Sequence, residues 1–174
     1  MLPRSARVVV VGGGIIGCST AYHLAKAGWK DIVLLERDKI TSGTTWHAAG
    51  LMVTYGSTCQ TSTEMRKYSK QLYSDIELET GQETGFRKCG FIELASTKDH
   101  QTEFRRTAAF NRLMGIDVQE IPPDEVKRLF PLCETEDLLS GFYVKDDGRI
   151  NPADVCQALR RGAKMHGANI IEDT

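Results

Sequence analysis

The sequence predicts an α/β fold that opens with a parallel β-α-β unit. Residues 7–11 (RVVVV) and 32–36 (IVLLE) are short aliphatic runs of the kind that form buried parallel strands. Residues 15–27, between them, carry the small and apolar side chains of a buried helix face, and Gly28 is suited to end that helix. Two strands joined by one helix are expected to lie parallel, with a right-handed crossover.

The rest of the chain alternates helices with strands. One segment is amphipathic, because Met65, Tyr68, Leu72 and Ile76 recur at helical spacing. Near the end, Asn151 followed by a proline marks the start of a further helix. We expect helices over residues 61–80, 98–114, 123–130 and 152–167, and strands over 89–95, 141–145 and 169–172.

Composition excludes some partners. The 22 Lys and Arg nearly balance the 23 Asp and Glu, for a net charge of −1, so no nucleic acid or anionic membrane is expected as a partner. No apolar run approaches the ~20 residues of a membrane helix. The five cysteines have no metal-like C-x-x-C spacing, and we expect small buried residues of a reduced, intracellular protein: Cys18, Cys59, Cys89, Cys133 and Cys156. No metal site is predicted.

A glycine-rich turn joins the first strand to the first helix. Gly12, Gly13, Gly14 and Gly17 fit the pattern G-x-G-x-x-G, and Glu36 ends the next strand 19 residues later. The first glycine permits the tight turn, the third lets the backbone approach a pyrophosphate, and the last lets helix and strand pack closely. Glu36 can accept hydrogen bonds from ribose hydroxyls, which argues against NADP and leaves NAD and FAD open. We therefore predict a Rossmann-type dinucleotide site.

Residues 41–50 (TSGTTWHAAG) are expected to form a loop, and the sequence of this loop helps to distinguish between NAD and FAD. Together with residues 147–152 (DGRINP), this loop resembles the N-terminal part of the D-amino-acid-oxidase-like flavoproteins. Within that family, the chain is most similar to the dimethylglycine and sarcosine dehydrogenases and their bacterial oxidase relatives. The resemblance implies FAD as the cofactor and covalent attachment of the flavin through His47. It also suggests Thr44 and Thr45 as donors to the pyrophosphate.

The distance from the predicted ribose contact to this histidine suits such a role. Eleven residues separate Glu36 from His47, and an extended chain of that length reaches ~36 Å. A neutral imidazole is also a good nucleophile toward an electron-poor flavin methyl position. Without the resemblance, His47 reads as a packing or surface residue.

The resemblance implies oxidation of a C–N bond in an N-methylated glycine, such as dimethylglycine or sarcosine. A hydride equivalent passes to the flavin, and the iminium is hydrolysed or its one-carbon unit passes to tetrahydrofolate. Members of the family often carry a C-terminal folate-binding region, and nothing of it is present in this sequence. Electrons then go to an electron-transfer flavoprotein or to oxygen. The compartment implied is the mitochondrial matrix in a eukaryote and the cytoplasm in a bacterium.

The predicted architecture is a Rossmann-type FAD-binding βαβ unit with an inserted α+β portion of a substrate domain, incomplete at its C-terminus. We assign residues 1–50 to the FAD-binding unit and histidine loop, 51–150 to the insertion and 151–174 to the returning helix and strand. Only three parallel strands are predicted, so we expect the N-terminal part of a longer protein, inactive alone. No catalytic residue toward the substrate is identified in it.

Two other functions remain open at this level. An NAD-dependent Rossmann dehydrogenase would share the glycine turn but leave residues 41–50 unexplained. A non-catalytic relative of the same fold, such as the pyruvate dehydrogenase phosphatase regulatory subunit, would have no need of a flavin tether at His47.

Overall fold

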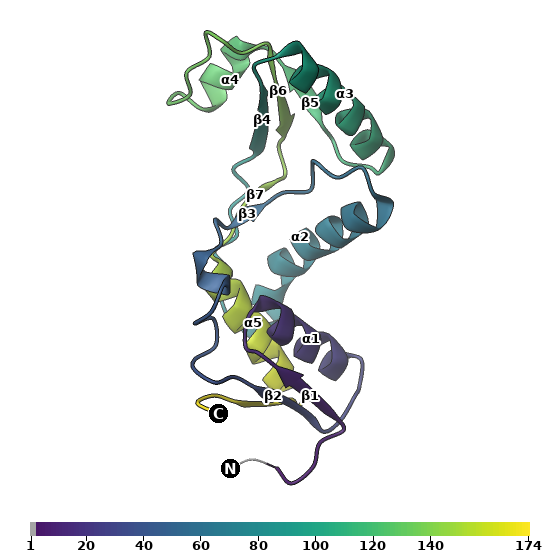
Figure 1. Ribbon diagram of the computed structural model, residues 1–174, viewed down its shortest axis with the longest axis vertical. Helices are drawn as coiled ribbons and strands as arrows, with labels where there is room; N and C mark the ends of the chain where they lie inside the picture. The colour runs from purple at the N-terminus through teal and green to yellow at the C-terminus, as the bar shows by residue number, and fades with distance from the viewer. Residues whose placement is uncertain (1–2) are drawn as a thin grey trace. The chain divides into compact units, whose positions relative to one another are not determined.

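The computed structural model describes residues 3–174 and divides into two compact units (Figure 1). The first unit comprises Met1–Gly50, Leu72–Phe86 and Ile150–Thr174. The second comprises Leu51–Gln71 and Arg87–Arg149. Each unit has its own cluster of buried apolar side chains.

The first unit is built on a parallel sheet of β1 (Val8–Val11), β2 (Ile32–Leu35) and β8 (Asn169–Ile171), in the order β1-β2-β8. Val8 pairs with Ile32, and Val33 pairs with Asn169. The α/β class and the parallel β-α-β start are therefore confirmed.

The prediction of a fully buried first strand is wrong. Val8 and Val10 pack against the core, but Val9 and Val11 are 53% and 83% exposed. The reason is that side chains alternate between the two faces of a strand, and Val9 and Val11 point to the face opposite the core cluster that Val8 and Val10 contact. In β2, which lies between β1 and β8, Ile32, Val33 and Leu34 are all buried.

Helices α1 (Ile15–Lys26) and α5 (Pro152–Met165) pack against each other and supply most of this core. The two helices lie so close together that a methyl group at Gly162 would press into the Tyr22 ring, so the contact requires glycine at this position. The Asn151 side chain caps α5, accepting hydrogen bonds from the N–H groups of residues 153 and 154, as the sequence predicts. Gly28, with φ +88°, follows the end of α1.

Helix α2 (Gln60–Thr80) forms over the expected residues, but its predicted apolar face is only half buried. Ile76 is buried and Leu72 partly so, whereas Met65 and Tyr68 are 65% and 54% exposed. The first half of the helix buries Thr63 instead, whose hydroxyl donates to the Cys59 carbonyl at 2.9 Å.

The second unit holds an antiparallel sheet of β4 (Phe91–Ala95), β6 (Ser140–Val144) and β5 (Gln119–Ile121), in the order β4-β6-β5. Helices α3 (Lys98–Leu113) and α4 (Pro123–Leu129) pack on it, and β3 (Leu51–Met52) pairs with β7 (Gly148–Arg149). The sequence does not predict β3, β5 or β7, which are two or three residues long and become strands only through their partners.

The turn before β7 contains a buried carboxylate. Asp147 is fully buried, and its side chain accepts hydrogen bonds from the Thr54 N–H at 2.7 Å and the Thr54 hydroxyl at 2.8 Å. The Lys70 ammonium lies 3.4 Å away. The hydrogen bonds between Asp147 and Thr54 therefore hold the turn before β7 in place.

The five cysteines are all free thiols, but they are not all buried. Cys18 and Cys156 are buried and Cys133 is partly so, whereas Cys59 and Cys89 are exposed, which corrects the expectation for those two. Within residues 3–174, no helix combines the length and the apolar character needed to cross a membrane.

Candidate functional site

The glycine turn lies where β1 ends and α1 begins. Gly12 has φ +109°, a conformation that favours glycine, and its N–H donates to the Leu35 carbonyl at 2.8 Å. The turn therefore sits at the carboxyl ends of two neighbouring parallel strands, where ligands bind in open α/β sheets.

Close contacts explain two further glycines. A methyl group at Gly17 would overlap the Gly12 carbonyl oxygen and lie 3.5 Å from Val10. The tightest contact of Gly17 is thus with the turn itself, rather than with the strand as expected. A methyl group at Gly13 would overlap the Ile40 side chain. Larger residues at either position would therefore disturb the turn.

Glu36 closes the turn from the end of β2. Its carboxylate accepts hydrogen bonds from the Gly13 N–H at 2.6 Å and from the Asp38 N–H at 2.9 Å. These bonds, first that from Asp38 and then that from Gly13, lower the pKa of Glu36, so the group is charged at neutral pH. A carboxylate offers about four lone-pair sites, so the remainder can still accept from a ribose hydroxyl.

Thr45 has a role that sequence reasoning missed. Its hydroxyl oxygen accepts a hydrogen bond from the Ile15 N–H at 2.9 Å, across 30 residues of chain. Thr45 is buried, whereas Thr44 is exposed. The first N–H groups of a helix have no partner within the helix, and Thr45 supplies one for α1. No local sequence signal joins these two positions.

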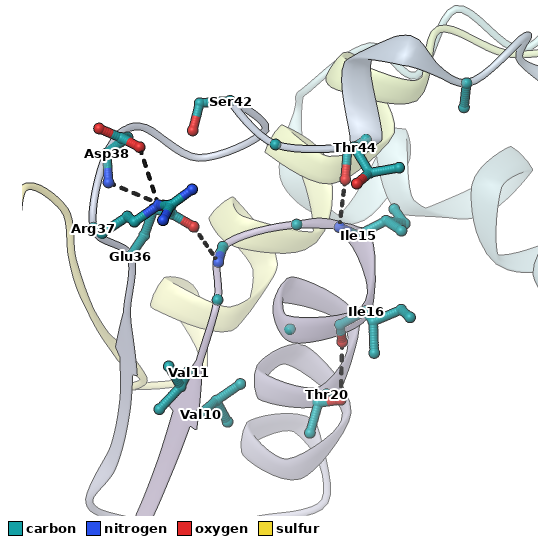
Figure 2. A pocket seen from close by; sticks show the side chains of 17 residues that line it. Val10, Val11, Ile15, Ile16, Thr20, Glu36, Arg37, Asp38, Ser42 and Thr44 are labelled. Carbon is teal, nitrogen blue, oxygen red and sulfur yellow. Dashed lines mark hydrogen bonds and ion pairs between the residues drawn. The ribbon is translucent and has the colours of Figure 1, made fainter.

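One pocket of about 600 Å³ gathers most of the predicted cofactor residues. Figure 2 shows Glu36 and Asp38 on one side of it and Ile15 and Thr44 on the other. Seven of the eight predicted residues line it: Gly12, Gly13, Gly14, Gly17, Glu36, Thr44 and Thr45. Arg37, Asp38 and Ser42 also line it and were not predicted, although their place just after the second strand could have indicated them.

His47 is the eighth residue and does not line the pocket, although its neighbour Ala48 does. It ends a short 3₁₀ helix, η1 (Thr45–His47), and its side chain is exposed. The ring nitrogen Nδ1 lies 3.1 Å from the Gly43 carbonyl oxygen, and the ring centroid lies 3.9 Å from that of Trp46. Because a carbonyl oxygen only accepts, Nδ1 carries the proton of the neutral ring and Nε2 keeps the lone pair.

Nowhere in residues 3–174 do three or more His, Cys, Asp or Glu side chains gather as a metal site would require. The polar groups that line the pocket at the glycine turn include backbone N–H groups, hydroxyls and the carboxylates of Glu36 and Asp38, and such groups can bind phosphates and ribose.

Comparison with known families agrees with this geometry. The family described as FAD dependent oxidoreductase matches residues 7–174. The chain belongs to this family. Among solved members of the fold, the L-proline dehydrogenase of P. horikoshii superposes with a TM-score of 0.91 at 26% identity, covering 99% of this chain and 45% of that one.

Within the FAD-dependent oxidoreductases, the chain is related to the sarcosine and dimethylglycine dehydrogenases and to a regulatory subunit. It is 42% identical to mitochondrial sarcosine dehydrogenase of Mus musculus, over 99% of this chain and 19% of that protein. It is 41% identical to mitochondrial dimethylglycine dehydrogenase of Rattus norvegicus, over 93% and 19%. It is also 40% identical to the mitochondrial pyruvate dehydrogenase phosphatase regulatory subunit of Mus musculus, over 99% and 20%. The chain thus spans about a fifth of the length of these relatives.

Proposed function

We propose that this chain supplies the FAD-binding pocket of an oxidoreductase that demethylates N-methylated glycines such as sarcosine or dimethylglycine. The observation that carries the proposal is the bond between the Glu36 carboxylate and the Gly13 N–H at 2.6 Å, which holds an acidic acceptor beside the glycine turn. The relatedness to sarcosine and dimethylglycine dehydrogenases supports the substrate class.

The adenosine and pyrophosphate parts of FAD fit the residues present. Side chains at Gly13 or Gly17 would collide with neighbouring protein atoms, and the tight turn that these glycines permit lines the pocket, where a phosphate could approach its backbone. The start of α1 adds free N–H groups and the positive end of the helix dipole. Glu36 would accept from the ribose hydroxyls while keeping its bond to the turn.

The loop from Ser42 to Ala48 would lead along the cofactor toward the flavin, and His47 would carry the flavin covalently. The Nδ1 contact with the Gly43 carbonyl leaves Nε2 as the nucleophilic nitrogen, so we assign the attachment to Nε2. A tethering role would also suit a histidine whose exposed ring lies against Trp46.

When bound, FAD would take a hydride equivalent from a carbon next to the amine nitrogen. The residues of this chain bind and orient it: the glycine turn holds the phosphates, Glu36 the ribose and His47 the flavin. Residues 51–150 are proposed to contribute to the substrate domain. No residue of this chain is assigned to the substrate itself.

A regulatory function is the second candidate, because a regulatory subunit is 40% identical over 99% of this chain. This candidate predicts no reduction of bound flavin by an amine. An NAD-dependent reading is no longer favoured, since the family to which the chain belongs is FAD-dependent.

The test uses the protein purified with its native flavin, precipitated with acid and run on a denaturing gel. We expect flavin fluorescence in the protein band, loss of that fluorescence in His47→Ala and retention in His100→Ala, the matched control on α3. A dark wild-type band would remove the covalent assignment. Bleaching of the flavin absorption by sarcosine or dimethylglycine without oxygen supports the enzyme, and a flavin that neither amine reduces favours the regulatory candidate.

A further inference from the structure

The carbonyl oxygen of Gly13 receives three hydrogen bonds from three separate segments. The Cys18 thiol on α1 and the Cys156 thiol on α5 each donate to it at 3.7 Å, and the Thr41 N–H donates at 3.1 Å. Both cysteines are fully buried. The two thiols also interact with each other: their mutual hydrogen bond, together with burial, raises the pKa of Cys18, and the same hydrogen bond lowers the pKa of Cys156.

Thr41 reaches this oxygen from a strained backbone conformation. Its φ is +76°, which is uncommon for a residue other than glycine and costly for one that branches at Cβ. Such strain persists where the surrounding structure determines the conformation, and it gathers at functional sites. Here, the conformation accompanies a hydrogen bond to the Gly13 oxygen.

The opposite side of the same peptide faces another way. The peptide between Gly13 and Gly14 is trans, so its C=O and N–H groups point in opposite directions. The three donors hold the C=O among buried groups, and the Gly14 N–H donates no hydrogen bond to any part of residues 3–174. Gly14 lines the pocket at the glycine turn. A fixed, unshared N–H in this place is a preorganised donor for an anion.

We propose that Cys18 and Cys156, with the Thr41 amide, are positioning residues that hold the Gly13 carbonyl inward and so aim the Gly14 N–H at the cofactor pyrophosphate. This inference rests on the proposed FAD site, which supplies the pyrophosphate. It gives the two buried thiols a role beyond filling space, because their polarity, and not only their volume, orients the peptide.

Serine and alanine separate these two roles. Serine and alanine are similar to each other in volume and both are smaller than cysteine, but only serine keeps a hydrogen-bond donor. We therefore compare Cys18→Ala/Cys156→Ala with Cys18→Ser/Cys156→Ser, each in flavin-free protein that also carries His47→Ala, so that no covalent flavin remains. The readouts are the dissociation constants of ADP, which contains the pyrophosphate, and of adenosine, which has no phosphate.

We expect the double alanine variant to bind ADP about five-fold more weakly, as the loss of two weak donors implies, with adenosine binding unchanged. The double serine variant should bind ADP within about two-fold of the starting protein, because its hydroxyls can replace the thiols as donors. If the double variants do not fold, Cys156→Ala and Cys156→Ser are compared in the same way, with about two-fold expected for alanine.

Unchanged ADP binding in the alanine variant would overturn the inference. So would an equal loss of ADP and adenosine, or a serine variant as weak as alanine, because either result indicates packing alone. A starting protein that binds neither FAD nor ADP would instead refute the proposed function, and this inference with it.

Discussion

The Glu36 carboxylate accepts a hydrogen bond from the Gly13 N–H at 2.6 Å, although 23 residues separate the two in the chain. The bond links the end of β2 to the turn that follows β1, so the turn takes its shape only when both strands are paired. One side chain thus serves both the fold and the proposed ribose contact.

Replacing Glu36 with Gln should therefore weaken both ligand binding and stability. Glutamine keeps one acceptor oxygen but presents an NH₂ group to one of two N–H donors. We expect about 1–2 kcal/mol less stability and about ten-fold weaker ADP binding. Urea denaturation and ADP titration measure the two effects. Glu103→Gln, an exposed change on α3, is the control, and equal behaviour of the two variants would contradict the role of Glu36.

Gly17→Ala should destabilise the first unit, because the added methyl group overlaps the Gly12 carbonyl oxygen and backbone atoms cannot move aside easily. We expect a loss of about 1–3 kcal/mol, the usual range for overpacking. The matched control is Gly43→Ala in the same pocket, where the methyl group would meet open space. The midpoint of thermal unfolding tests this, and two variants of equal stability would show that the turn is looser than described.

Glu79 at the end of α2 joins three polar partners in the first unit. Its carboxylate accepts from the Tyr22 hydroxyl and the Lys26 ammonium, both at 2.7 Å, and lies 2.8 Å from His166 Nε2. Burial acts to raise the pKa of Glu79, but the hydrogen bonds from Lys26, His166 and Tyr22 outweigh it and lower the pKa to about 2.

This shift predicts a stability difference that depends on pH. A carboxylate with a lowered pKa stabilises the fold above its ordinary value of 4.5, and the contribution is lost as pH falls from 4.5 toward 2. Glu79→Gln should cost about 1 kcal/mol at pH 7, since the cluster is partly exposed, and progressively less in acid. Urea midpoints across this range, with exposed Glu77→Gln as the control, measure it. A difference independent of pH would point to packing instead of charge.

The sequence predicts those helices and strands that depend only on residues near one another in the chain. Asn151 caps its own helix, and the aliphatic runs at 8–11 and 32–35 form strands, because side-chain identity and spacing determine both. The pairing of β3 with β7 depends on residues almost one hundred positions apart, which no periodicity contains. Exposure of Val9 and Val11 likewise depends on which face of β1 the core covers, and elements distant in the sequence determine that.

The residues of the candidate site likewise include some that the sequence predicts and others whose contacts are seen only in the structure. The glycine spacing and Glu36 are visible in the sequence, because each glycine meets a local need for positive φ or close approach. The bonds of Thr45 to Ile15, and of Cys156 to Gly13, join segments that meet only after folding. Their hydroxyl and thiol groups carry no motif, so these supporting contacts had to come from the structure.

The chain leaves the first unit at Gly50, returns to it for Leu72–Phe86 and enters it for the last time at Ile150, where the Ile150 N–H donates to the Gly50 carbonyl at 2.8 Å. The two ends of the intervening segment are thus fixed to each other, independently of its contents. The entropy of closing a loop grows only with the logarithm of its length. The stretches Leu51–Gln71 and Arg87–Arg149 could therefore change in length at little thermodynamic cost, whereas Leu72–Phe86 must be kept, because it supplies Ile76 to the core of the first unit.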